Sequence, residues 1–86
     1  MTSMHVRLEL YASLMKHLPP DAVRHRAEVD VDVGTSPHDL LDRYGIPREQ
    51  AHLVLRNGVF LYPEQRDDIP LEEGDVIAVW PPVAGG

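Results

Sequence analysis

The chain has 86 residues, no cysteine and a formal net charge of −6 at neutral pH. This length predicts one small domain with a modest core, and the composition excludes disulfides, thiolate-bound metals and a cysteine nucleophile. Fourteen acidic against eight basic residues argue against nucleic acid as a partner, because phosphate contacts need an excess of Lys and Arg. We expect no signal peptide and no membrane span, because no long apolar run follows the first residues, and we expect a reducing, cytoplasmic location.

The first third of the chain predicts two paired strands. Residues 5–11 alternate polar and apolar side chains, which indicates a strand buried on one side. Residues 14–20 end in two prolines and predict a turn or a short helical loop. Residues 27–33 alternate valines with acidic residues, which favours an edge strand, antiparallel to the first. The residues expected to point inward are Val6, Leu8, Leu10, Val29, Val31 and Val33.

A helix is predicted to begin after Gly34. Ser36 (or Thr35) suits the N-cap, Pro37 the first helical position and Asp39 the first turn. Gly45 is a good stop, and the following Ile-Pro pair prevents continuation. Residues 47–51 have room for one more helical turn. The buried stripe of the helix is predicted to be Leu40, Leu41 and Tyr44.

The second half predicts a hairpin and a final strand. Strands at 52–56 and 59–62 flank Asn57-Gly58, the strongest short-range hairpin signal. An acidic loop over 63–70 and a turn over 72–75 lead to a strand at 76–80. The expected hairpin pairs are Arg56 with Val59, Leu55 with Phe60, Val54 with Leu61 and Leu53 with Tyr62.

This order predicts an α+β domain over residues 1–80 and a flexible tail over residues 81–86. One helix covers only one face of a mixed four- to five-stranded sheet, so the other face stays open. We assign Val54, Leu61, Ile77 and Val79 to the core. The opposite face then carries an apolar patch at the base of the tail, which we predict to be a partner-binding site. The patch consists of Leu55, Phe60, Ala78 and Trp80. Alternatively, the 63–70 loop folds over this patch, or the two faces are reversed.

The tail combines two stiff prolines with two glycines at its end. It reads Pro81, Pro82, Val83, Ala84, Gly85, Gly86. A narrow tunnel can close around glycine, which has no Cβ, and the prolines favour an extended spacer. Six extended residues reach about 20 Å, far enough to bring the Gly86 carboxylate into another protein's active site. An incidental chain end is the alternative.

Other side chains offer little chemistry. The five histidines have no metal-chelating spacing, so no metal site is predicted. An acidic cluster, which we expect near the tail, is either a docking surface for a basic activating enzyme or a solvated loop. Its members are Asp67, Asp68, Glu72, Glu73 and Asp75.

These elements together resemble the ubiquitin-like sulfur-carrier proteins of the MoaD/ThiS family. The resemblance rests on two strands, a capped helix, an Asn-Gly hairpin, the segment Leu71-Glu72-Glu73-Gly74-Asp75, a last apolar strand and the terminal Gly-Gly. It implies a β-grasp fold. The tail looks most like the small subunit of molybdopterin synthase, whereas the short connection over 45–51 looks more like the thiamine-pathway carrier.

The resemblance also implies a mechanism and partners. A ubiquitin-activating-like adenylyltransferase would use ATP to adenylate Gly86, and a sulfur donor would then leave a thiocarboxylate. The acceptor would be the large subunit of molybdopterin synthase, or another sulfur-acceptor enzyme. The chain would bind no cofactor and would be a protein cosubstrate rather than an enzyme. The other readings are a carrier for thiamine, cysteine or another thio-metabolite, a protein modifier conjugated through Gly86, and a plain interaction module.

Overall fold

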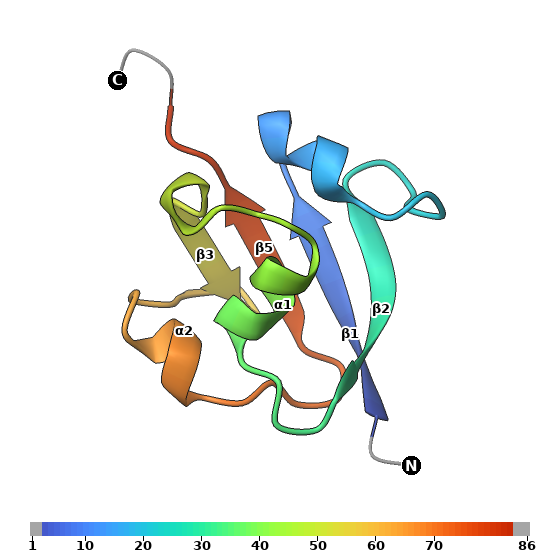
Figure 1. The fold of residues 1–86 in the computed structure, drawn as a ribbon, viewed down its shortest axis with the longest axis vertical. Helices are drawn as coiled ribbons and strands as arrows, with labels where there is room; N and C mark the ends of the chain where they lie inside the picture. Colours follow the sequence, from blue (N-terminus) through green and yellow to red (C-terminus); the bar gives the residue numbers. More distant parts are fainter. Residues whose placement is uncertain (1–2, 84–86) are drawn as a thin grey trace.

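A five-stranded mixed sheet with helices on one face forms the body of the molecule (Figure 1). The computed structural model describes residues 3–83. The sheet has the strand order β2-β1-β5-β3-β4. Its strands are β1 (Ser3–Leu10), β2 (Arg26–Asp32), β3 (Leu53–Arg56), β4 (Val59–Phe60) and β5 (Val76–Trp80). The helices are α1 (Pro37–Arg43) and α2 (Gln65–Asp68), with 3₁₀ helices η1 (Ala12–His17) and η2 (Arg48–Gln50). No helix within residues 3–83 has the length and apolar character needed to cross a membrane.

The centre of the sheet is a parallel pair, β1 and β5, with Leu10 opposite Val79. Strand β2 runs antiparallel to β1, as predicted, and β3 runs antiparallel to β5. Because β1 and β5 are parallel, their carboxyl ends lie at the same edge of the sheet. The η1 helix and the tail therefore both leave from that edge, away from the amino terminus (Figure 1).

Helix α1 begins and ends where the sequence predicts. The Ser36 hydroxyl accepts a hydrogen bond from the Asp39 N–H at 3.0 Å, and the Asp39 carboxylate accepts one from the Ser36 N–H at 3.1 Å. This reciprocal cap satisfies two N–H groups that the helix itself leaves unpaired. Gly45 follows the helix with a φ of +75°, a conformation that glycine adopts without strain.

The core lies between α1 and the face of the sheet beneath it. The four predicted core positions Val54, Leu61, Ile77 and Val79 are all buried, so the assignment of the two faces is confirmed. Helix α1 contributes Leu40 and Leu41, while Tyr44 is only partly buried at its end. The predicted inward residues Val6, Leu8, Leu10, Val29 and Val31 are also buried.

Three details differ from the prediction. Val33 is exposed, because β2 ends one residue earlier at Asp32. The hairpin has the predicted pairs of Arg56 with Val59 and Leu55 with Phe60, but β4 stops there. Leu61 still donates its N–H to the Val54 carbonyl at 2.9 Å. The expected acidic loop contains the short helix α2, which packs on α1.

Candidate functional site

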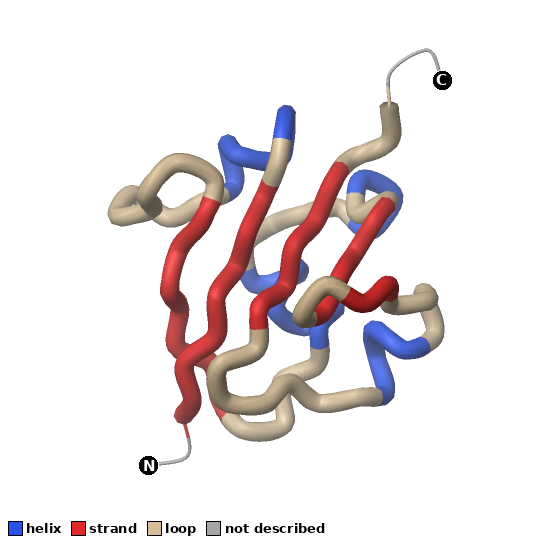
Figure 2. The backbone as a smooth tube through the Cα atoms, turned by 180° about the vertical axis from the view of Figure 1, so that it is seen from behind, coloured by secondary structure: helices blue, strands red, loops and turns tan. Residues whose placement is uncertain are grey.

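The face of the sheet opposite α1 carries no helix (Figure 2). Its apolar part lies on β5, β3 and β4, where Leu55 and Trp80 are half-buried and Phe60 is 38% exposed. The loop over 63–70 leaves these residues accessible, since its helix packs on α1 in the other layer, although its Arg66 side chain reaches the Phe60 ring. The face is thus accessible to a partner, but its role in binding stays a prediction.

One member of the predicted patch is not exposed. Ala78 retains 7% of its accessible surface. It lies in the middle of the sheet, opposite Glu9 on β1 and Leu55 on β3. A methyl side chain between two longer neighbours is covered by them, so the expectation of an exposed Ala78 was wrong. Leu55, Phe60 and Trp80 remain as the accessible patch.

A stack of three rings, which the sequence analysis missed, lies at the base of the tail. The rings of Tyr11 and Trp80 are parallel within 2°, with centroids 4.2 Å apart. The His25 ring lies against Tyr11, at 4.5 Å and 30°. The Tyr11 hydroxyl donates to the Glu9 carboxylate at 3.0 Å. Burial, together with this bond and the nearby negative charge, raises the pKa of Tyr11. A predicted parallel pairing of β1 with β5 would have placed Tyr11 beside Trp80.

A second aromatic pair lies at the far edge of the same face. Phe60 and Tyr62 meet edge to face at 5.0 Å. The Arg66 guanidinium carbon is 5.8 Å from the centre of the Phe60 ring. Arg66 is buried and donates to the carbonyl oxygens of Leu61 and Ala51 at 2.8 to 3.0 Å. Burial lowers the pKa of Arg66. No sequence pattern predicts this anchor, because Arg66 lies within an acidic segment.

The predicted acidic cluster is not near the tail. Glu72, Glu73 and Asp75 lie where β5 begins, whereas the tail leaves where β5 ends (Figure 1). The carboxylate of Asp67 is hydrogen-bonded to Nδ1 of the His38 ring, with the two atoms 2.9 Å apart. The expectation was wrong because β5 separates these acids from the start of the tail, although they are close to it in sequence. Most of these acids hold the fold together instead of surrounding the tail.

Asp75 is the most constrained of these acids. Its carboxylate accepts hydrogen bonds from the Asn57 side chain at 2.9 Å and the Glu72 N–H at 2.8 Å. Arg56 forms an ion pair with it at 2.7 Å, with both side chains largely buried. Burial alone would raise the pKa of Asp75, but the bonds from Asn57, Glu72 and Arg56 together lower it. The carboxylate is therefore charged and fully engaged, which suits a structural role.

The start of the tail continues β5 beyond the sheet. Trp80 is the last strand residue, Pro81 is partly buried, and Pro82 and Val83 are exposed. The predicted reacting residues Gly85 and Gly86, and Ala84 before them, lie outside the described residues.

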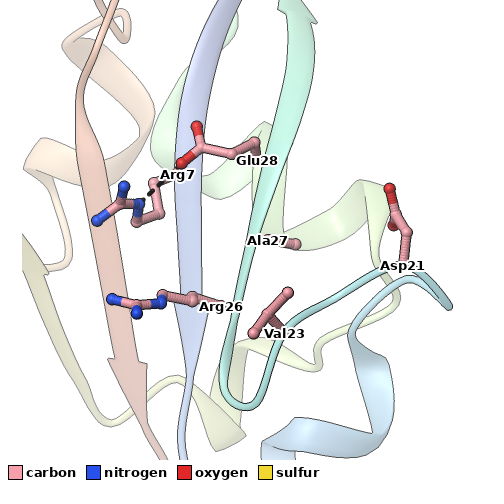
Figure 3. Close-up of a pocket in the computed structure, with 6 residues that line it drawn as sticks. All are labelled: Arg7, Asp21, Val23, Arg26, Ala27 and Glu28. Carbon is pink, nitrogen blue, oxygen red and sulfur yellow. Dashed lines mark hydrogen bonds and ion pairs between the residues drawn. The ribbon is translucent and has the colours of Figure 1, made fainter.

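A pocket on the β1–β2 side of the molecule offers a different environment (Figure 3). Arg7 and Arg26 extend to one side of β2, while Asp21 and Val23 lie on the other side. Arg7 pairs with Glu28 at 3.0 Å. The mixed charges show no preference for an anion or a cation. Across residues 3–83, no group of three or more His, Asp or Glu side chains has the arrangement needed to hold a metal ion.

The chain is similar to a known protein family and to solved structures. The model of the ThiS family matches residues 11–86. The structure is similar to the solution structure of the Haloferax volcanii HVO 2177 protein, with a TM-score of 0.76 and 22% identity over 99% of this chain and 89% of that one. At that identity the likeness shows the fold alone. The structure is also similar to the crystal structure of SAMP1 from Haloferax volcanii, with a TM-score of 0.65 and 27% identity over 95% of this chain and 99% of that one.

No curated protein sequence matches significantly. The family match nevertheless covers most of the chain, including β5 and the tail. The sheet order and the single main helix beneath it agree with the β-grasp fold of such proteins. This chain therefore belongs to the ThiS family of ubiquitin-like sulfur carriers.

Proposed function

We propose that this chain carries sulfur as a thiocarboxylate on Gly86 and donates it to the large subunit of molybdopterin synthase. The observation that carries the proposal is the placement of the tail. Strand β5 directs Pro81, Pro82 and Val83 outward from the sheet edge, with Trp80 and the accessible patch at its base. The family match extends through Gly86.

Small carriers of this family are generally not catalysts. They interact with activating enzymes and with proteins that accept the sulfur. In this chain the proposed reacting atom is on the main chain, and no side chain is asked to transfer a proton. The chain is accordingly proposed to be a protein cosubstrate, with ATP consumed by the activating enzyme and no cofactor held by the carrier.

The proposed chemistry begins with a poor electrophile. The Gly86 carboxylate attacks the α-phosphorus of ATP on a ubiquitin-activating-like adenylyltransferase, and pyrophosphate leaves. The terminal sulfur of a persulfide then attacks the acyl carbon, and AMP leaves. A thiol reduces the resulting acyl disulfide, forming a new disulfide and releasing the thiocarboxylate. That sulfur is then a nucleophile on an arm that enters the acceptor protein.

The architecture suits a carrier that docks twice. The patch of Leu55, Phe60 and Trp80 can contact each partner in turn, while the tail reaches its active site. Burial of aromatic anchors is a common source of binding energy in such interfaces. Two consecutive prolines keep the arm extended and lower the entropy lost when it enters a tunnel. A cytoplasmic location stays a prediction that rests on the composition.

Deletion of Gly86 tests the proposal. The deletion variant is expected to lose sulfur loading and sulfur donation, while its thermal midpoint stays at the wild-type value. Val83→Ala is the matched control, since it changes an exposed tail side chain and keeps the tail length. A deletion variant that still donates sulfur would refute the role of Gly86.

A second pathway has one observation in its favour. The connection between α1 and β3 is short and contains only the 3₁₀ turn Arg48–Gln50, the feature that resembles the thiamine-pathway carrier. Co-purification with a thiazole synthase, in place of the synthase large subunit, would select this pathway. A role in making cysteine or another thio-metabolite would be identified in the same way, by co-purification with the enzyme that accepts the sulfur in that pathway. Isopeptide-linked adducts of Gly86 in cell lysate would instead point to a protein modifier.

A further inference from the structure

The chain leaves the sheet after Trp80. Trp80 is the last residue of β5, and its carbonyl accepts a hydrogen bond from the His52 N–H at 3.0 Å. On the β1 side, the last backbone bond runs from the Tyr11 N–H to the Val79 carbonyl at 3.1 Å. Pro81 and Pro82 have no N–H to donate, so they cannot continue the ladder. Within residues 81–83, no backbone hydrogen bond to β1 is present.

Tyr11 supplies the contact that the backbone lacks on that side. Its ring lies parallel to the Trp80 ring with a centroid distance of 4.2 Å, and a stacked aromatic pair is stabilising beyond the burial of both rings. Tyr11 itself contacts the ring of His25, the residue before β2, and its hydroxyl donates a hydrogen bond to the Glu9 carboxylate. The Trp80 side chain therefore stacks on a ring that His25 and Glu9 hold in place.

A small rotation at Trp80 is amplified along the tail. A residue before proline is restricted to extended conformations, and two prolines behave as a semi-rigid spacer of about 3 Å per residue. A rotation of about 10° at Trp80 therefore moves the end of the two-proline segment, about 6 Å away, by about 1 Å. A misplacement of about 1 Å can slow a reaction about 100-fold, because reacting groups must meet in a narrow range of geometries.

We propose that Tyr11 is a positioning residue for sulfur loading: by stacking on Trp80, it fixes the direction in which Pro81 and Pro82 leave the sheet. This inference rests on the proposed function. Tyr11 need not touch the activating enzyme or the acyl group to act in this way. Its ring, and not its hydroxyl, is the part that matters.

Three variants separate positioning from stability. Tyr11→Leu removes the ring, whereas Tyr11→Phe keeps it and loses only the bond to Glu9. Tyr44→Leu is the matched control, because Tyr44 is also a partly buried tyrosine but packs against the core at the end of α1. Each full-length variant is assayed for loading with the activating enzyme, ATP and a persulfide donor, at a temperature where circular dichroism shows it folded.

The expected result is a loss in kcat alone. Tyr11→Leu should lower kcat for loading about 10- to 100-fold and leave KM for the carrier within about twofold. Tyr11→Phe and Tyr44→Leu should both stay within about threefold of the wild-type kcat. Trp80 is the only tryptophan, so its fluorescence anisotropy decay reports the ring directly. The indole should move more freely in Tyr11→Leu and not in the other two variants.

Two results would overturn the inference. One is a folded Tyr11→Leu variant that loads sulfur at the wild-type rate. The other is an indole whose mobility is unchanged in that variant, because Tyr11 would then not hold Trp80. If the wild-type chain itself does not load sulfur, the proposed function fails, and the anisotropy measurement alone decides whether Tyr11 positions the tail base.

Discussion

The two ends of strand β5 are fixed by different kinds of contact. At its start, Asp75 is surrounded by hydrogen bonds from Asn57 and Glu72 and an ion pair with Arg56. At its end, Trp80 is held by the Tyr11 ring and by backbone pairing with the β3 side, including the bond from the His52 N–H. The first set is polar and is centred on the largely buried Arg56–Asp75 ion pair. The second is apolar and half-buried.

The difference separates stability from function along one short strand. A buried carboxylate must be fully paired within the chain, so Asp75 has nothing left to offer a partner. A half-buried ring still has surface to bury, so the end of β5 can gain energy from a partner. The variants below use this contrast, beginning with the largest expected effect.

Loss of Asp75 should cost the most stability. Asp75→Ala leaves the Arg56 guanidinium buried without its partner, which should lower the free energy of unfolding by about 3 to 5 kcal/mol. Urea unfolding followed by circular dichroism measures this loss. Where the variant is folded, its sulfur loading should match the wild type. A loss below about 1 kcal/mol would contradict the structural role given to this end of β5.

Loss of Trp80 should act mainly on binding. Trp80→Ala should weaken binding to the activating enzyme by about 2 kcal/mol, or about 30-fold, because a central aromatic anchor is removed. Titration calorimetry measures this change. Phe60→Ala, at the far edge of the same patch, is the comparison and should cost less. Equal losses for the two variants would argue against a binding centre at the tail base.

Acid should weaken the start of β5 selectively. The folded-state pKa of Asp75 is lowered, so its stabilisation is present above about pH 4, the ordinary carboxyl value, and is lost as pH falls through the lower folded value. The free energy of unfolding, measured with urea, should fall between about pH 6 and about pH 3, and it should fall less steeply in Asp75→Asn than in the wild type. If the free energy of unfolding depended on pH in the same way in both proteins, the acid sensitivity could not be assigned to Asp75.

The smallest effect is expected for the exposed ion pair on the open face. Arg7 and Glu28 are 3.0 Å apart, but their side chains are 40% and 64% exposed, compared with 15% and 6% for Arg56 and Asp75. Water and salt screen such a pair, so Glu28→Gln should change the free energy of unfolding by about 0.5 kcal/mol or less. A larger change in urea unfolding would show that exposure to solvent does not determine how much these ion pairs stabilise the fold.

The sequence predicted what depends on local chemistry. The Ser36 cap, the Gly45 stop and the Asn57-Gly58 turn are all determined by a few neighbouring residues, and each is confirmed. The two faces of β5 were also assigned correctly, because the hairpin register transmits the alternation from strand to strand. The family followed from the order of these elements.

Contacts between distant segments were not predictable in the same way. The Tyr11–Trp80 stack needs the parallel pairing of β1 with β5, which no short pattern encodes. Arg66 was missed because its three bonds go to main-chain carbonyls, and these leave no trace in the sequence. Ala78 was predicted to be exposed because strand alternation gives the face of a side chain but not the size of its neighbours.

Intact-protein mass spectrometry tests the central claim most directly. The full chain is purified from its own cells, or incubated with its activating enzyme, ATP and a persulfide donor, and the product is fragmented to locate any modification. The account predicts a mass gain equal to sulfur replacing one oxygen, located on Gly86. An unmodified Gly86 in the presence of an enzyme that consumes ATP with this chain, or sulfur located on any other residue, would contradict it.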